Sequence, residues 1–262
     1  MKNTLLTAVL AVSALAATGT IKAGTISGKV SATSGKPLEG VMISAFDKGH
    51  RKFVSVFSQG DGSFVIDGLR DVKHDVRARL MGFEDEWSDG VKADARNMKF
   101  RLKAATGDDL QDQRPASSGF SMLKFDNKRD KLNFKMMCSY CHQVGTVGFR
   151  TPEQPVDWET MVRRMDGFGG LYRHTQKTIV KRLMDTYKDD AIRKWPVFVP
   201  PAAPTGLAAK ARITAWELGK KLESSFHDLE LGPDGLVYAV NISKHRIVTL
   251  DPETGEQRVY QL

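Results

Sequence analysis

Two cysteines and a histidine stand together in the segment KMMCSYCHQVG, which covers residues 135–145. Cys138 and Cys141 are separated by two residues, His142 follows directly, and the chain has no other cysteine. Three chemistries use such a pair of thiols: a redox-active disulfide, half of a zinc site, and covalent attachment of haem. Only haem attachment requires a histidine directly after the second cysteine, so the surrounding sequence must decide between them.

The N-terminus has the features of a secretory signal peptide over residues 1–23. Lys2 is followed by an apolar run and then by small residues, which offer cleavage sites after Ala17 or Ala23. The run is shorter than the roughly 20 apolar residues that a membrane-spanning helix needs, and no other segment is long and apolar enough. We therefore expect an exported protein in the periplasm of a Gram-negative type of bacterium, with no transmembrane segment after cleavage.

The other two uses of the cysteine pair fit the sequence less well. A disulfide across two residues would close a very small loop, and the βαβ pattern of thioredoxin-like enzymes does not surround Cys138. A zinc site needs about four ligands, and the chain has no second cysteine pair and no H-x-x-x-H to complete the set. Haem attachment is the interpretation that uses Cys138, Cys141 and His142 together.

The motif follows a predicted short helix, residues 130–137, which places both cysteines at its C-terminal end. This region resembles the c-type cytochromes, whose C-x-x-C-H motif stands intact as Cys138, Cys141 and His142. The resemblance covers roughly residues 121–195 and implies one covalently bound haem c. It implies thioether bonds from both cysteines and His142 as the proximal ligand of the haem iron.

The second axial ligand of the iron is less directly indicated. In RTPEQPVDWETMVRRMDGFGGL, residues 150–171, Asp157 can cap a helix that runs to about Met165. The segment resembles the W-x-x-x-V-x-R-M-x-x-x-G pattern of some dehydrogenase haem domains and related short cytochromes, where the methionine binds iron. Carried over, that methionine is Met165. Other side chains with a suitable donor atom follow the motif: Met161, His174 and Met184.

The region before the motif, residues 24–104, has short alternating strands spaced by about ten residues, which predicts a β-sandwich. It resembles the carboxypeptidase regulatory-like, transthyretin-like sandwich. The matching stretches are GKV at 28–30, GKPLEGV at 35–41 and DGSFVIDGL at 61–69. The resemblance implies a fold and an interaction module without a catalytic site.

Polar residues 105–120 and Pro-rich residues 196–207 are predicted linkers on either side of the haem region. Residues 208–262 then return to strands and turns. GPDGLVY at 232–238 and RIVTLDPETGE at 246–256 resemble one blade of the streptogramin (virginiamycin B) lyase-like propellers. A propeller needs about 4–8 blades, so we expect an incomplete propeller and transfer no catalytic residue to this chain.

The formal net charge of +8 suggests acidic partners. Lysines and arginines gather at 127–135 and 173–182, where they are either a docking face for acidic redox partner proteins or an ordinary solvated surface. Nucleic acid is not an expected partner, because no recognisable binding motif is present.

The expected fold class is multidomain: an all-β sandwich, then a small all-α cytochrome c domain, then the strands of an incomplete propeller. The expected function is one-electron transfer in the periplasm by an exported monohaem protein. Two alternatives remain. One is a haem-bearing subunit or fragment of a propeller enzyme, dehydrogenase or lyase-like, and the other is a ligand-binding module.

Overall fold

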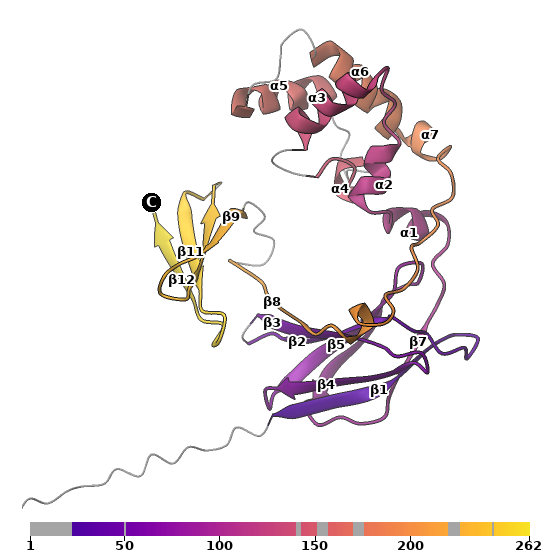
Figure 1. Ribbon diagram of the computed structural model, residues 1–262, viewed down its shortest axis with the longest axis vertical. Helices are drawn as coiled ribbons and strands as arrows, with labels where there is room; N and C mark the ends of the chain where they lie inside the picture. The colour runs from indigo at the N-terminus through magenta and orange to yellow at the C-terminus, as the bar shows by residue number, and fades with distance from the viewer. Residues whose placement is uncertain are drawn as a thin grey trace, which may run out of the picture.

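The computed structural model describes residues 23–49, 51–139, 143–150, 157–169, 176–219, 226–242 and 244–262. This part of the chain forms twelve β-strands in three sheets and seven short α-helices, of which the longest have 12 residues (Figure 1). The molecule is therefore mostly β.

The N-terminal strands form a β-sandwich. One sheet has three strands in the order β4-β1-β7, and the other has five in the order β6-β5-β2-β3-β8. All pairs are antiparallel except β1 with β7, which is parallel. The first seven strands are β1 (Gly24–Ala32), β2 (Met42–Asp47), β3 (Lys52–Phe57), β4 (Ser63–Leu69), β5 (Lys73–Arg79), β6 (Glu86–Lys92) and β7 (Met98–Leu102).

Alternation along the strands builds the core of the sandwich. In β5, His74, Val76 and Ala78 are buried while the residues between them are more exposed, as expected when successive side chains point to opposite faces. Thirteen buried apolar residues from both sheets form one cluster: Ile26, Val30, Val41, Ile43, Ala45, Val54, Phe64, Ile66, Leu69, Val76, Ala78, Phe100 and Leu102.

The turn between β3 and β4 carries the chain from one sheet to the other. Gly62 has a φ of 76°, and a Cβ atom there would lie 2.2 Å from the carbonyl oxygen of Val30. Both the positive φ and the close approach require glycine at this position. β3 lies in the five-stranded sheet and β4 in the three-stranded sheet.

The fifth strand of the larger sheet comes from far along the chain. β8 (Ile213–Trp216), which the sequence grouped with the C-terminal strands, pairs instead with β3. Arg212 donates to the backbone oxygen of Asp67 at 2.8 Å and also pairs with its carboxylate. The Pro-rich segment before β8 lies against the sandwich as well, since a Cβ on Gly40 would approach Ala203 Cβ to 2.6 Å.

A helical segment, residues 107–192, is inserted between β7 and β8. Its elements are α1 (Gly107–Asp112), α2 (Ala116–Ser121), α3 (Lys128–Cys138), α4 (Val147–Arg150), α5 (Trp158–Gly169), α6 (Gln176–Tyr187) and α7 (Asp189–Ile192), and a 3-10 turn, Ala208–Lys210, follows. None of the helices in the described ranges combines the length and apolar composition needed to cross a bilayer.

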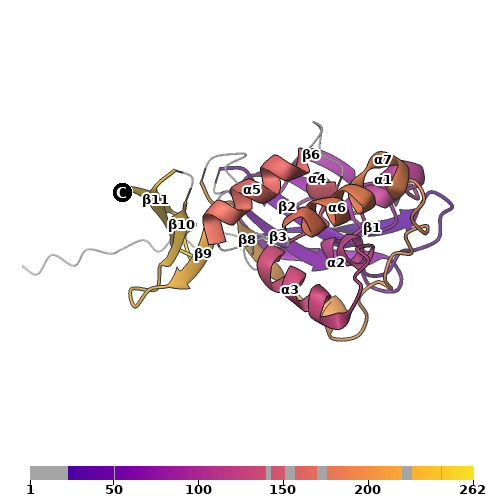
Figure 2. The same ribbon diagram turned by 90° about the horizontal axis from the view of Figure 1, so that it is seen from above.

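The start of the helical segment is bonded both to the sandwich and to the chain that follows the last helix. Gln113 accepts a hydrogen bond from the backbone N–H of Gly82 at 2.7 Å and donates to the backbone oxygen of Phe83 at 2.8 Å. Arg114 donates to the backbone oxygen of Pro196 at 2.6 Å, just before the chain returns to the sandwich. Figures 1 and 2 show the helices above the five-stranded sheet.

The expected fold class is wrong on this point. The helices do not stand apart as an all-α cytochrome c domain, because Gln113 near their start is bonded to the sandwich and the chain after them packs on the sandwich and supplies β8 to one of its sheets. The structure instead has three sheets with short helices inserted between two strands.

The third sheet is an antiparallel meander at the C-terminus, in the order β12-β11-β10-β9. Its strands are β9 (Phe226–Leu231), β10 (Val237–Asn241), β11 (Arg246–Leu250) and β12 (Gln257–Gln261). One apolar row crosses all four strands. Its inner members, Ala239 and Val248, are fully buried, whereas the outer members, Leu229 and Val259, are 64% and 55% exposed.

Candidate functional site

Cys138 is the last residue of α3, as the sequence predicted for the cysteine motif. The helix begins after Asn127, whose side chain accepts a hydrogen bond from the backbone N–H of Asp130 at 2.8 Å and so satisfies a free donor of the first turn. The predicted helix at 130–137 is thus confirmed and extends slightly at both ends. Phe134 is buried on the inner face of α3, and Met137 and Cys138 are partly buried there.

Burial governs the chemistry of the Cys138 thiol. Desolvation raises the pKa of Cys138 from 9.0 to about 11. The thiol is therefore protonated at neutral pH, and a protonated thiol is neither a good nucleophile nor a ready metal ligand. A buried thiol at the end of a helix suits a structural or covalently attached role better than a catalytic one.

Met165 lies in α5, and its helix begins as the sequence predicted. Asp157 accepts hydrogen bonds from the backbone N–H groups of Glu159 at 3.0 Å and Thr160 at 3.2 Å. Hydrogen bonding from the Thr160 side chain and backbone lowers the pKa of Asp157, which keeps this cap ionised. The helix continues past the expected end near residue 165 and reaches Gly169.

Cys138 and Met165 pack against the same apolar cluster, which we call the helical core. The other two described methionine candidates face outward: Met161 is 36% exposed and Met184 is 50% exposed. Burial therefore favours Met165 among the described methionines. The buried members of the helical core are Leu123, Phe134, Val144, Trp158, Val162, Ile179, Val180, Leu183 and Tyr187.

Three of the predicted site residues, Cys141, His142 and His174, lie outside the described residues. Within the described ranges, no group of three or more His, Cys, Asp or Glu side chains is placed to hold a metal ion. Of the predicted haem site, the described residues therefore include Cys138 and Met165.

Arg150 is a buried cation that no motif or spacing in the sequence singles out. Arg150 is 2% exposed. Its guanidinium donates hydrogen bonds to four backbone oxygens, those of Gly145 at 2.7 Å, Gln111 at 2.8 Å, Arg114 at 3.1 Å and Asp112 at 3.2 Å. Burial lowers the pKa of Arg150, although a guanidinium remains charged in proteins. These bonds fasten the segment that follows the cysteine motif to α1.

The aromatic rings of the helical core surround Tyr187. Its ring centroid lies 5.9 Å from Phe149, 6.2 Å from Trp158 and 6.0 Å from Trp195. The hydroxyl donates to the backbone oxygen of Gly119 at 3.2 Å, and burial raises the pKa of Tyr187. Tyr187 therefore serves the packing between helices.

Residues 25–103 match the model of the carboxypeptidase regulatory-like domain. The sandwich predicted for residues 24–104 is thus confirmed as this domain. No model of a c-type cytochrome or a β-propeller family matches the chain. No curated protein matches the chain either.

Proposed function

We propose that this chain is an exported one-electron carrier with a single haem c. In this proposal Cys138 and Cys141 bind the haem covalently, His142 is the proximal ligand of the iron, and Met165 is the distal ligand. The observation that carries the proposal is the placement of Cys138 and Met165 against one apolar core, on two different helices.

The described residues fit such a group in their chemistry. A haem is a large, flat and mostly apolar ring, and the helices near Cys138 and Met165 leave large apolar side chains exposed. Leu132 and Met136 of α3 are 55% and 65% exposed, and Phe168 of α5 is 75% exposed. Phe168 comes three residues after Met165 on the same helix, so its ring would cover part of a bound haem. Leu132 and Met136 lie on the face of α3 opposite Phe134 and Cys138 and do not contribute to this fit.

The donor atoms suit one-electron chemistry rather than catalysis. Haem iron supplies a one-electron couple, and a histidine and methionine pair raises its reduction potential. The thioether of Met165 is neutral and cannot exchange a proton, so its ligation adds no pH dependence of its own. Trp158 and Val162 are buried on the same helix and limit the access of water to this side chain.

Acidic redox proteins are the proposed partners, and the proposed location is the periplasm. Lys128, Lys131 and Lys135 are exposed on α3, the helix that ends in Cys138. If they guide docking, electron exchange with an acidic protein should slow as salt rises, because the Debye length falls to about 8 Å at physiological ionic strength. A rate that does not depend on salt would mean that these lysines are an ordinary solvated surface.

Covalent attachment is the direct test of the proposed function. The full chain should be produced in a bacterial host that carries cytochrome maturation genes and purified from the periplasm. We expect a Soret band and a haem stain that both survive denaturing electrophoresis. Cys138→Ala should weaken or abolish the stain, while Met184→Ala should keep it. A colourless wild-type protein from this host would contradict the proposal.

A second candidate function is that of a haem-bearing part of a propeller enzyme. The exposed outer members of the apolar row in the C-terminal sheet, Leu229 and Val259, are the kind of surface that a neighbouring blade would cover. A gene that continues beyond Leu262 with repeats of the GPDG pattern would support it. A reading frame that stops there would contradict it.

A further inference from the structure

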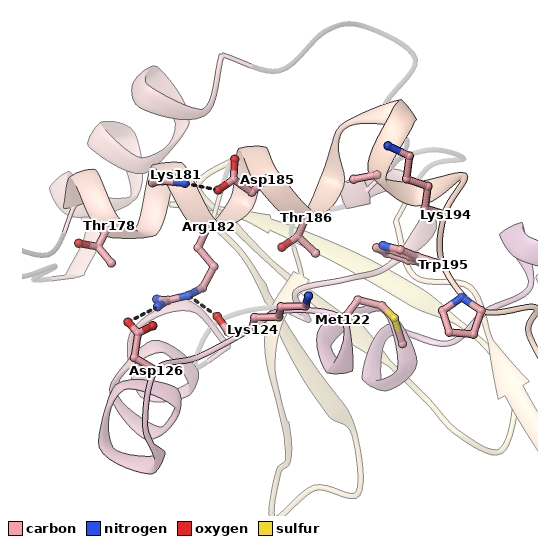
Figure 3. A pocket seen from close by; sticks show the side chains of 12 residues that line it. Met122, Lys124, Asp126, Thr178, Lys181, Arg182, Asp185, Thr186, Lys194 and Trp195 are labelled. Carbon is pink, nitrogen blue, oxygen red and sulfur yellow. Dashed lines mark hydrogen bonds and ion pairs between the residues drawn. The ribbon is translucent and has the colours of Figure 1, made fainter.

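A pocket of about 690 Å³ lies on the helical segment, away from Cys138 and Met165 (Figure 3). Its walls are the segment after α2, helix α6, and the chain from the end of α7 to Pro196. The volume falls within the range of about 300–1,000 Å³ that small-molecule sites occupy. The pocket is therefore large enough for a ligand of moderate size.

Positive charge exceeds negative charge around this pocket. Four cationic and two anionic residues line it, which gives a net charge of 4 − 2 = +2: Lys124, Lys181, Arg182, Lys194, Asp126 and Asp185. Such a surplus attracts anions and repels cations.

Two of the cations are occupied within the protein. Lys181 pairs with Asp185 one turn further along α6. Arg182, whose side chain is only 9% exposed, donates to the backbone oxygen of Lys124 at 2.7 Å and to the Asp130 carboxylate at 2.6 Å. Lys124 and Lys194 have no ion-pair partner among the described residues. The unpaired positive charge of the pocket therefore comes from these two ammonium groups.

The end of the pocket near Lys194 also carries an aromatic ring, that of Trp195 (Figure 3). The Trp195 ring packs edge-on against Tyr187, with a centroid distance of 6.0 Å, and the Arg114 guanidinium lies 5.5 Å from its centroid. These contacts hold the ring in place. Met122 lies near it in the lining (Figure 3), and Pro196, the next residue along the chain, also lines the pocket. The site thus has a cationic part and a fixed flat ring within one cavity.

We propose that this pocket binds a small organic anion with a flat apolar body, such as an aromatic carboxylate. The carboxylate would pair with Lys124, with the hydroxyl of Thr186 as a hydrogen-bond donor nearby, and the ring of the ligand would pack on Trp195. A cation is disfavoured by the net charge, and an inorganic anion would leave the aromatic end of the pocket unused. The proposal does not depend on haem or on electron transfer.

Calorimetric titration of the full chain with naphthalene-2-carboxylate tests the charge requirement. Naphthalene-2-carboxamide is the matched control probe, because it has the same ring and nearly the same shape without the charge. We expect the carboxylate to bind about fivefold more tightly than the amide at low salt, and the difference to shrink as salt rises. Equal affinity for the two probes, or no binding of the carboxylate, would overturn the proposal.

Variants then test the location. Lys124→Gln should weaken binding of naphthalene-2-carboxylate about three- to fivefold, since it removes the unpaired ammonium but leaves the backbone oxygen that Arg182 uses. Lys36→Gln, an exposed site on a turn of the sandwich, removes the same charge elsewhere and should leave binding unchanged. If Lys36→Gln weakens binding as much as Lys124→Gln, the effect is one of overall charge and the proposed site is wrong.

Trp195→Leu tests the aromatic end of the pocket. It should weaken binding of both probes by a similar factor, because each contains the ring. This variant also loses packing against Tyr187, so its unfolding midpoint must be measured alongside. Lys124 is exposed, so Lys124→Gln should fold normally. Its result therefore tests the site even if Trp195→Leu does not fold.

Discussion

The sandwich and the helical segment bury apolar side chains in different ways. The sandwich encloses thirteen aliphatic and phenylalanine side chains between two sheets, and Met98 packs at its border. The helical core has nine buried residues, includes tryptophan and tyrosine, and carries sulfur-bearing side chains at its border. It also leaves large apolar groups such as Met136 and Phe168 exposed.

This difference distinguishes the sandwich, which stabilises the fold, from the helical segment, which carries the candidate site. A core closed between two sheets gives stability without a place for a ligand, whereas a core with cysteine and methionine side chains at its border has donor atoms there for one. Some large apolar side chains of the helical segment are not covered by other parts of the protein. The candidate haem residues Cys138 and Met165 lie in the same segment. Mutations in the two regions should therefore affect different properties.

The largest effect should come from the sandwich core. Phe100 is 2% exposed and its ring centroid lies 6.0 Å from that of Phe64. Phe100→Ala should lower the free energy of unfolding by about 3–5 kcal/mol, measured by urea unfolding, because it leaves a cavity between the sheets. Val65→Ala on β4, where the side chain is 57% exposed, should cost less than about 0.5 kcal/mol. Equal losses from the two variants would contradict the described core.

In the helical segment, the corresponding large loss of stability should come from replacing Arg150. Arg150→Met should cost about 2–4 kcal/mol in urea unfolding followed by tryptophan fluorescence, because it leaves two buried and two partly buried carbonyl oxygens without their donor. Arg163→Met, an exposed site on α5, is the matched control and should be nearly neutral. A neutral Arg150→Met would show that water replaces the guanidinium.

Met165 should affect the iron more than the fold. Met165→Ala should lower the reduction potential of the protein, measured by redox titration, and leave the haem attached, because a soft neutral donor to the iron is lost. Its cost in stability should be on the order of 1–2 kcal/mol, since the side chain is only partly buried. Met184→Ala should leave the potential unchanged. A drop in potential with Met184→Ala alone would move the ligand to α6.

The smallest effect should come from a turn of the sandwich and depend on pH. Hydrogen bonds from the Ser63 side chain and backbone, with a smaller contribution from Lys29, lower the pKa of Asp61 from 3.8 to about 2. Since the folded pKa is the lower one, the stabilisation is present above about pH 4 and is lost as the pH falls to about 2. Asp61→Asn should be slightly less stable than wild type at about pH 6.

Urea midpoints at both pH values check this expectation. The difference between Asp61→Asn and wild type should disappear near pH 2, where the wild-type carboxyl group is also becoming neutral. Asp71→Asn, at an exposed position in the next turn, should match wild type throughout. A difference that persists at low pH would show that the loss has another cause, such as strain in the turn.

Local patterns made several parts of this structure predictable. The regular alternation of the first strands and the turn residues around Gly62 identified the carboxypeptidase regulatory-like domain. An apolar pattern predicted the helix that ends in Cys138, and the Asp157 cap predicted the helix that contains Met165, because each signal lies within a few residues of the chain. The haem itself stays a prediction.

Long-range contacts were not predictable in this way. β8 reads as one more strand of the C-terminal group, and only its pairing with β3 assigns it to the sandwich. The expected all-α domain was wrong for the same reason, since the bonds of Gln113 that tie the helices to the sandwich leave no periodic signal. Arg150 is likewise a single charged residue whose burial depends on carbonyls up to 39 positions away.

The position of β8 also sets an order on folding. β3 is synthesised early, but its partner at the sheet edge comes only after the whole helical segment. Until then, β3 presents unpaired backbone groups that can recruit a foreign strand. Pairing β3 with β8 requires contacts between distant parts of the chain, and such contacts form slowly. A chain cut short before Ile213 would therefore leave the backbone groups at the edge of β3 unpaired, and it should aggregate more readily than the full chain.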